Sequence, residues 1–288
     1  MTHYPTDWLG NGKFHLSEPD LMTDHQPTDV LYEEEGAVAV LTLNRPASLN
    51  SFTRRMHRDL WSALDRVEAN RTIRALVITG AGRGFCAGAD LSEFDFSDGP
   101  NLAKRADPGP VIEQAFNPTT RRLLQVRVPT VCAVNGVAAG AGASVAMACD
   151  ITIAEPAASF IQAFSKIGLV PDSGGTWLLP QRVGLARAMA LCLTGDKLSA
   201  ADAKAMGMIW DVQEDALGAA KAMAQRLATM PTRALVATRH LLRGAHTHTL
   251  DEQLDIERDI QSRLGFTHDY IEGVTAFLQK RPAQFRGE

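Results

Sequence analysis

The sequence predicts an α/β protein with a helical C-terminal region. Three observations support this prediction. Between residues 36 and 154, short apolar stretches typical of buried strands alternate with amphipathic stretches typical of helices. Helix-length connections between strands imply a core with crossover connections. After about residue 214, four more helical patterns follow without an intervening strand.

Each expected element follows from a local pattern. Residues 36–44 alternate apolar and other side chains, as strands do, and residues 53–70 gather apolar side chains on one helix face. The Asp-, Gly- and Pro-rich residues 92–110 predict a loop. The other core elements expected are strands at 74–79, 130–134 and 150–154 and helices at 111–126 and 141–149. The C-terminal helices are expected at 214–228, 233–243, 250–264 and 269–280.

Length and composition are those of an ordinary globular protein. The chain has 288 residues, 45% of them hydrophobic and 22% charged, with a net charge of -4. This balance gives no general attraction to nucleic acid or to a membrane. We expect an N-terminal extension at 1–27, a core at 28–213 and a helical region at 214–288. The extension is polar, without the apolar run of a signal peptide, and is expected to be flexible.

Two compositional features bear on the location of the protein. The four cysteines form no C-x-x-C pair, which indicates reduced thiols in a cytoplasmic protein. Residues 128–149 carry no charge and contain a G-x-x-x-G pattern, so a membrane helix is an alternative. Pro129, Asn135 and three glycines favour a short buried strand, a glycine turn and a buried helix instead.

Two glycine-rich turns, at 80–90 and 135–143, each follow an expected strand. Glycine lets the backbone approach a ligand closely, and free amides at such a turn or at a helix N-terminus can bind negative charge. A dinucleotide-binding fingerprint is an alternative reading, but Phe85 stands where its third glycine should be and no helix follows. Two tight turns without any ligand are a further alternative.

A third segment, G-L-V-P-D-S-G-G-T at 168–176, supplies a carboxyl group. Asp172 is a candidate acid–base residue, because a carboxyl near a ligand-binding turn can move a proton. The alternative is structural, since Asp172 and Ser173 could cap the helix that follows.

Together, these segments resemble the crotonase, or enoyl-CoA hydratase/isomerase, superfamily. The matching stretches occur in the family's order: L-N-R-P at 43–46, G-R-G-F-C-A-G-A-D at 82–90, V-N-G-V-A-A-G-A-G at 134–142 and the segment at 168–176. Within the superfamily, A-F-S-K at 163–166 and G-G-T-W-L-L-P at 174–180 most resemble the ring-1,2-epoxyphenylacetyl-CoA isomerases of bacterial phenylacetate degradation.

The resemblance implies a crotonase, or ClpP-like, fold of repeated ββα units whose C-terminal helices assemble trimers or hexamers. It implies an acyl-CoA thioester as substrate, with no other cofactor and no metal. His246 and His248 form an H-x-H pair, which is no metal site without further ligands.

The resemblance also assigns roles to residues. It implies that the amides of Ala89 and Ala141 form an oxyanion hole. The two glutamates of family hydratases align with Ser144 and Phe164, which leaves Asp172 as the single carboxylate, and one carboxylate suits moving one proton from carbon to carbon. We therefore expect an isomerase. A hydratase and a non-catalytic acyl-CoA-binding scaffold are the alternatives.

Further residues are expected around the substrate. Phe164 and Trp177 should make the surroundings of Asp172 apolar and raise its pKa. Phe277 and Lys280 should cover the nucleotide from a neighbouring subunit. The alternative for Lys280 is an ordinary cation at a helix C-terminus. The alternative for Asp90 is a structural role in a turn. The expected substrate- and CoA-binding set is Arg45, Asn50, Phe85, Ala87, Asp90, Leu91, Gly140, Phe164, Trp177, Phe277 and Lys280.

Overall fold

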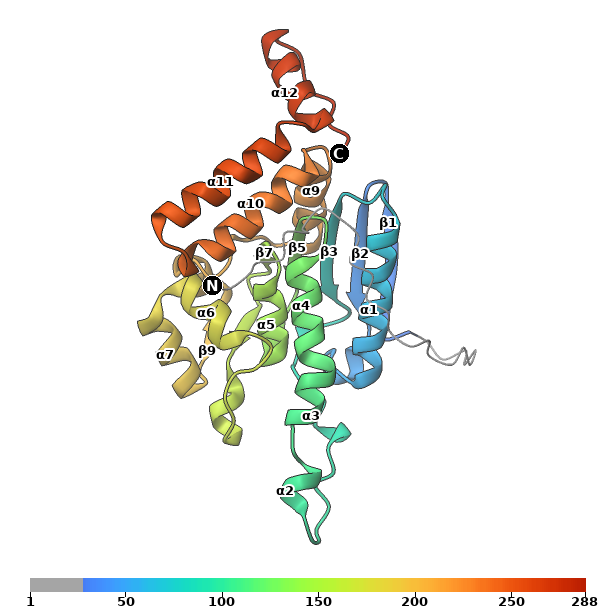
Figure 1. The fold of residues 1–288 in the computed structure, drawn as a ribbon. Helices are drawn as coiled ribbons and strands as arrows, with labels where there is room; N and C mark the ends of the chain where they lie inside the picture. The colour runs from blue at the N-terminus through green and yellow to red at the C-terminus, as the bar shows by residue number, and fades with distance from the viewer. Residues whose placement is uncertain (1–27) are drawn as a thin grey trace.

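The computed structural model describes residues 28–288, and the expected N-terminal extension at 1–27 lies outside them. A six-stranded sheet forms the centre of the molecule (Figure 1). Its first pair is antiparallel and all its other pairs are parallel. The strands, in spatial order, are β1 (Val30–Glu35), β2 (Val38–Leu43), β3 (Ala75–Gly80), β5 (Thr130–Val134), β7 (Ile151–Ala154) and β10 (Asp211–Val212).

Helices bury both faces of this sheet, because side chains alternate between the two sides of each strand. Helix α1 (Arg54–Ala69) lies over one face, with Thr53 as its N-cap, and α9 (Ala216–Ala228) lies over the other. Four alanines spaced four residues apart let α9 approach the sheet closely. Helix α9, which was expected in the C-terminal helical region, thus packs against the sheet as part of its hydrophobic core.

A second sheet of four strands was not predicted. It consists of β4 (Gly84–Cys86), β6 (Val137–Ala139), β8 (Ser159–Ile161) and β9 (Lys197–Ser199), in that order. The first three strands are parallel to one another, and β9 runs antiparallel to β8. Three residues are too few to display the alternating pattern that identifies a strand.

The other expected core elements are present with small shifts in their bounds. Helix α4 (Asn117–Gln125) follows a π-helical turn, η3 (Ile112–Phe116), and α5 (Ala141–Ala148) begins directly after β6. The uncharged stretch at 128–149 thus contains two strands and a helix, so the membrane-helix alternative is wrong. Among residues 28–288, no helix combines the length and the apolar character needed to cross a bilayer.

The smaller elements are η1 (Pro46–Ser48), η2 (Leu91–Glu93), α2 (Leu102–Arg105), α3 (Gly109–Val111), η4 (Ala163–Ile167), α6 (Gly175–Val183), α7 (Leu185–Thr194), α8 (Ala200–Ala205) and η5 (Ala245–Thr247).

The last three helices are α10 (Thr232–Gly244), α11 (Leu250–Leu264) and α12 (His268–Leu278). Helix α12 projects beyond the body of the molecule, at the end opposite α2 (Figure 1). The chain after α12 folds back: the amides of Arg286 and Gly287 donate to the carboxylate of Asp269, each at 2.7 Å. The guanidinium of Arg74 donates to the carbonyl of Phe285 at 2.6 Å, which ties this tail to the core.

We predict that His57 makes the fold sensitive to acid. Its ring stacks on Phe52 with centroids 4.7 Å apart, its Nδ1 lies 2.7 Å from Oγ1 of Thr119, and burial lowers its pKa from 6.5 to about 4. A folded-state pKa below the usual value means that the folded state favours the neutral ring. The contribution of His57 to the free energy of unfolding is therefore complete above pH 6.5. It is lost as pH falls toward 4, and the loss is roughly 3 kcal/mol at most.

Chemical denaturation at several pH values measures this effect. The variant His57→Leu should be less stable than the parent at pH 7, because it loses the bond to Thr119. Its free energy of unfolding should nevertheless fall less steeply between pH 6.5 and 4. An unchanged slope would assign the acid sensitivity to other groups.

Candidate active site

Three loops that carry predicted site residues begin where neighbouring parallel strands end. Residues 87–90 follow β4, residues 140–141 follow β6 and residues 162–164 follow β8. Because these strands are parallel, their carboxyl ends meet at one edge of the second sheet. The sheet that the sequence did not predict is therefore the element that brings the predicted residues together.

The backbone fixes the direction of the Ala89 amide. Ala89 forms a parallel bridge with Phe52, in which the Phe52 amide donates to the Gly88 carbonyl at 2.7 Å and the Asp90 amide donates to the Phe52 carbonyl at 2.9 Å. In such a bridge the N–H and C=O groups of the central residue point away from the partner strand. The Ala89 amide therefore faces away from Phe52 and has no backbone acceptor among the described residues.

The Ala141 amide lies beside the loop that carries Ala89. Ala141 is the first residue of α5, and Gly140 before it has a φ of 52°. First-turn amides of a helix have no acceptor within the helix, and the helix dipole favours negative charge there. A Cβ atom on Gly88 (φ 96°) would lie 2.9 Å from the Ala139 carbonyl oxygen and 3.6 Å from the Ala141 nitrogen. Glycine at position 88 is thus what allows the two loops to meet, and it supports the predicted pairing of the two amides.

The main chain of Asp172 contacts α5 one helical turn after Ala141. The hydroxyl of Ser144 donates to the carbonyl of Asp172 at 3.2 Å, and Ser144 follows Ala141 by three residues on α5. The N-cap of α6 is Gly174, without a side-chain cap bond, so the alternative that Asp172 and Ser173 cap this helix is wrong. The Asp172 carboxylate accepts a bond from the Ser173 hydroxyl at 3.0 Å.

The surroundings of Asp172 favour its protonated form. Burial raises its pKa above the ordinary 3.8, and the hydrogen bond from Ser173 opposes this shift only in part. This confirms the predicted direction. Of the two expected apolar neighbours, Phe164 lies next to Gly140, since a Cβ there would be 3.5 Å from the ring. Trp177, the other expected neighbour, is 41% exposed and packs edge-on against His246.

The two positions that align with hydratase glutamates carry no acid–base group. Ser144 is fully buried and its hydroxyl is engaged with the carbonyl of Asp172, and Phe164 is buried. The role of Ser144 as a link between the two halves of the site was missed in the sequence. Its only signal is its position one helical turn after Ala141.

The structure separates the residues expected around the substrate into accessible and inaccessible ones. Ala87, Asp90 and Gly140 are partly exposed and Leu91 is exposed, so a ligand can reach them. Asn50 and Phe85 are fully buried, and both polar atoms of the Asn50 side chain are bonded to the backbone. Their side chains therefore cannot line the ligand path, and that prediction is corrected.

The remaining expected residues are Phe277, Lys280 and Arg45. Phe277 and Lys280 are exposed, on the projecting α12 and just after it (Figure 1). Arg45 forms an ion pair with Asp90. Among residues 28–288, no three His, Cys, Asp or Glu side chains are grouped as a metal site requires.

Comparison with known proteins agrees with this architecture. The profile of the enoyl-CoA hydratase/isomerase family matches residues 33–288. The chain is 51% identical to the 1,2-epoxyphenylacetyl-CoA isomerase of Escherichia coli K12, over 90% of this chain and 98% of that protein. It is 40% identical, with the same coverage, to a probable enoyl-CoA hydratase of Rhodobacter capsulatus. A solved structure of a putative enoyl-CoA hydratase/isomerase from Mycobacterium abscessus has a TM-score of 0.82 at 35% identity, covering 90% of this chain and all of that one.

Proposed function

The chain belongs to the enoyl-CoA hydratase/isomerase family and has the crotonase fold, and within that family we propose that it is an isomerase. Its proposed substrate is 2-(1,2-epoxy-1,2-dihydrophenyl)acetyl-CoA, and it should also convert 3-enoyl-CoA to 2-enoyl-CoA. The substrate assignment rests on the 51% identity to the Escherichia coli isomerase. The reaction type rests on the site itself.

In the proposed reaction, the thioester carbonyl accepts hydrogen bonds from the amides of Ala89 and Ala141. The Asp172 carboxylate removes a proton from the carbon next to the carbonyl or from its vinylogous position, which gives an enolate. The two amides stabilise the negative charge that develops on the oxygen. Asp172 then returns the proton to another carbon, so the product keeps the formula of the substrate. In the epoxide substrate, the carbon–carbon bond shared by the two rings opens and yields a seven-membered oxepin.

One observation carries the proposal: burial raises the pKa of the Asp172 carboxyl, while Ser144 and Phe164, at the positions expected to align with the hydratase glutamates, offer no carboxyl group. The amides of Ala89 and Ala141 support it as the proposed donors. Adding water across a double bond requires a group that activates water, and neither a hydroxyl held by a carbonyl nor a phenyl ring can act as that base. Moving a proton between two carbons requires only one positioned base.

Two simple substrates test the proposal. The protein should convert 3-hexenoyl-CoA to the 2-enoyl isomer and should hydrate crotonyl-CoA slowly or not at all. Conversion of the epoxide to the oxepin, followed by chromatography and mass spectrometry, tests the finer assignment. Efficient hydration of crotonyl-CoA would make the protein a hydratase. Turnover of none of these thioesters would support the scaffold alternative.

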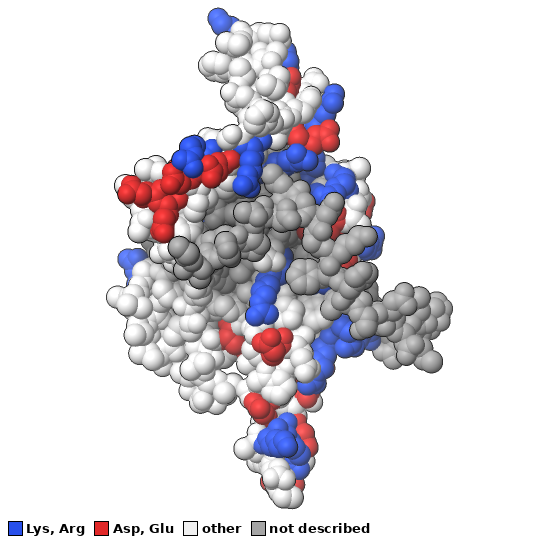
Figure 2. All heavy atoms as spheres, viewed as in Figure 1, with Lys and Arg blue, Asp and Glu red and all other residues white. Residues whose placement is uncertain are grey.

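We further propose that the chain forms a homo-oligomer through its C-terminal helices. Phe266, Phe277 and Leu278, within and beside α12, are 90%, 82% and 74% exposed. Figure 2 shows α12, at the top, as mainly uncharged on this face, whereas acidic and basic side chains gather on α11 below it. Large apolar side chains grouped on a projecting helix mark a contact surface.

Replacing Leu278 and Phe277 together by aspartate should dissociate the oligomer, because each buried carboxylate would be unpaired. Light scattering after size exclusion should give a multiple of the 31.2 kDa chain mass for the parent and the single-chain mass for the variant. Leu102→Asp, on α2 at the other end of the molecule, is the control and should leave the mass unchanged. A parent that is monomeric contradicts this proposal.

A further inference from the structure

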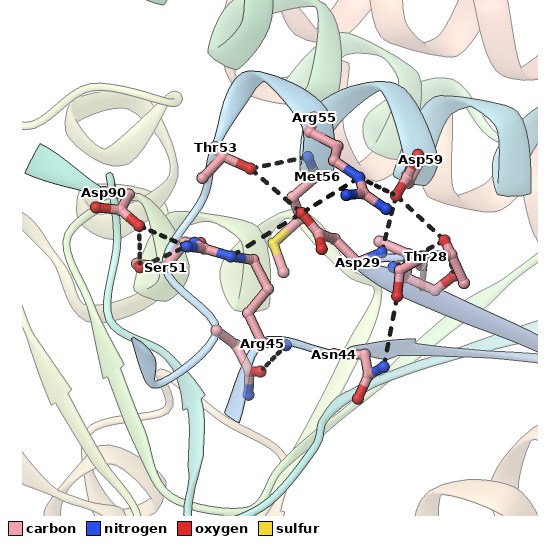
Figure 3. A network of polar contacts seen from close by, with 12 residues as sticks. Thr28, Asp29, Asn44, Arg45, Ser51, Thr53, Arg55, Met56, Asp59 and Asp90 are labelled. Carbon is pink, nitrogen blue, oxygen red and sulfur yellow. Dashed lines mark hydrogen bonds and ion pairs between the residues drawn. The ribbon is translucent and has the colours of Figure 1, made fainter. Parts of the chain in front are cut away.

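Arg45 was expected among the residues that line the path of the CoA nucleotide and pantetheine, but its guanidinium is already engaged within the chain (Figure 3). Its Nη2 lies 2.8 Å from a carboxylate oxygen of Asp90, and its Nη1 donates to the carbonyl of Ser51 at 2.5 Å. Its Nε lies 3.9 Å from the carboxylate of Asp29. All three nitrogen atoms of the guanidinium therefore face acceptors of the protein.

The charge around Arg45 does not favour a phosphate. Arg55 lies 4.0 Å from Asp29 and 3.8 Å from Asp59, so three carboxylates, including that of Asp90, surround two guanidinium groups (Figure 3). This cluster has a formal charge of -1, counted over these five residues. A phosphate would have to displace a carboxylate that is already bonded in good geometry.

The carboxylate of Asp90 is held at both of its oxygen atoms. One oxygen accepts from Arg45 and from the hydroxyl of Ser51 at 3.2 Å, and the other accepts from the amide and the hydroxyl of Ser92. Burial opposes its charge, but the bonds from Ser92 and Arg45 lower its pKa to about 2. The side chains of Arg45 and Asp90 are only 22% and 14% exposed, so water screens this pair weakly.

Asp90 directly follows Ala89, whose amide is one donor of the proposed oxyanion hole. The Ala89 amide is held on one side by the bond from Phe52 to Gly88 and on the other by the Asp90 amide, which donates to Phe52. The ion pair with Arg45 fixes the side chain of Asp90, the residue that makes the second of these two bonds. Donors of an oxyanion hole stabilise the transition state only when their direction is fixed before the reaction.

We infer that Arg45 and Asp90 are positioning residues: their ion pair holds the Ala89 amide in line with the thioester carbonyl, and Arg45 does not bind the nucleotide. This inference rests on the proposed function, because it concerns the same oxyanion hole. Loss of one oxyanion donor lowers kcat about 10²- to 10³-fold. A donor that is present but points in the wrong direction should therefore lower kcat about 10- to 100-fold.

A pair of thioesters separates positioning from nucleotide binding. The same acyl group is supplied as its CoA thioester and as its N-acetylcysteamine thioester, which has no phosphate. Arg45→Met should lower kcat about 10- to 100-fold with both substrates and leave the ratio of their KM values unchanged. A loss that appears only as a higher KM for the CoA thioester would overturn the inference, and so would unchanged kinetics with both substrates.

Three further variants complete the test. Asp90→Asn should produce the same loss of kcat as Arg45→Met, and the double variant should lose no more than either, because the two residues act as one unit. Additive losses would overturn the inference. Arg226→Met, at an exposed position on α9, is the matched control and should behave as the parent does.

A spectroscopic measurement keeps the inference testable without turnover. An aromatic enoyl-CoA that absorbs in the near ultraviolet shifts to the red when hydrogen bonds polarise its carbonyl group. The parent should shift the band, and Arg45→Met should shift it less at saturating ligand. An equal shift in both proteins would overturn the inference. A parent that shifts the band but turns over no substrate would contradict the proposed function alone.

Discussion

Replacing Asp172 by asparagine is expected to lower kcat for isomerisation of 3-hexenoyl-CoA about 10²- to 10⁴-fold, because that is the typical contribution of a positioned acid–base group. Asparagine keeps the size and polarity of the side chain but cannot accept the proton. KM should change little, since the carboxylate is expected to contact the reacting C–H bond rather than the bulk of the ligand. Steady-state kinetics measures both quantities.

The pH profile and the stability of this variant separate a chemical defect from misfolding. The pKa of Asp172 is raised by burial, so kcat of the parent should fall as pH drops through a value above 3.8. A carboxyl whose folded-state pKa is raised stabilises the fold at low pH and loses that contribution as pH rises through its folded pKa. At pH 7 the buried charge is therefore a cost that Asp172→Asn removes.

The melting temperature of Asp172→Asn at pH 7 should accordingly equal or exceed that of the parent. The exposed control Asp196→Asn should change neither activity nor melting temperature. An Asp172→Asn protein that is stable and keeps more than a tenth of the parent's kcat would show that another group moves the proton.

The central sheet was predictable because its inner strands are long enough to display their pattern. Residues 130–134 are five consecutive apolar or β-branched residues between a proline and a polar turn, and β5 has these bounds. The second sheet was missed because its strands have three residues each, and two of them, β4 and β6, lie in glycine-rich segments. Local sequence gives no signal for a strand whose stability depends on neighbours far along the chain.

The candidate site was predictable where backbone chemistry determines it. The glycine-rich turns at 80–90 and 135–143 were expected to let the backbone approach a ligand, and the structure brings the two turns together at Gly88 and Gly140. Side-chain surroundings were predicted less well, because they depend on packing. The contact of Trp177 with His246 was not predicted, and neither were the bonds of the Asn50 side chain to the backbone. The ion pair between Arg45 and Asp90 was not predicted for the same reason, since the two residues are 45 positions apart in the chain.

Removing one amide donor should have an effect of similar size to the loss of Asp172, and the position of Ala141 makes this possible. Proline has no N–H group, and it is tolerated at the first residue of a helix, which is where Ala141 stands. The residue before a proline must avoid the α region, and Gly140, with φ 52° and ψ -124°, already does so. Ala141→Pro should therefore fold and lack one of the two proposed donors.

We expect Ala141→Pro to lower kcat about 10²- to 10³-fold, which corresponds to roughly 2.7–4 kcal/mol of transition-state stabilisation. The control Ala141→Ser keeps the amide and adds one atom, so it should retain most of the activity. The shift of the aromatic enoyl-CoA band should shrink in the proline variant and persist in the serine variant. A proline variant as active as the parent would mean that the thioester oxygen binds elsewhere, because no side chain can replace an amide at the start of α5.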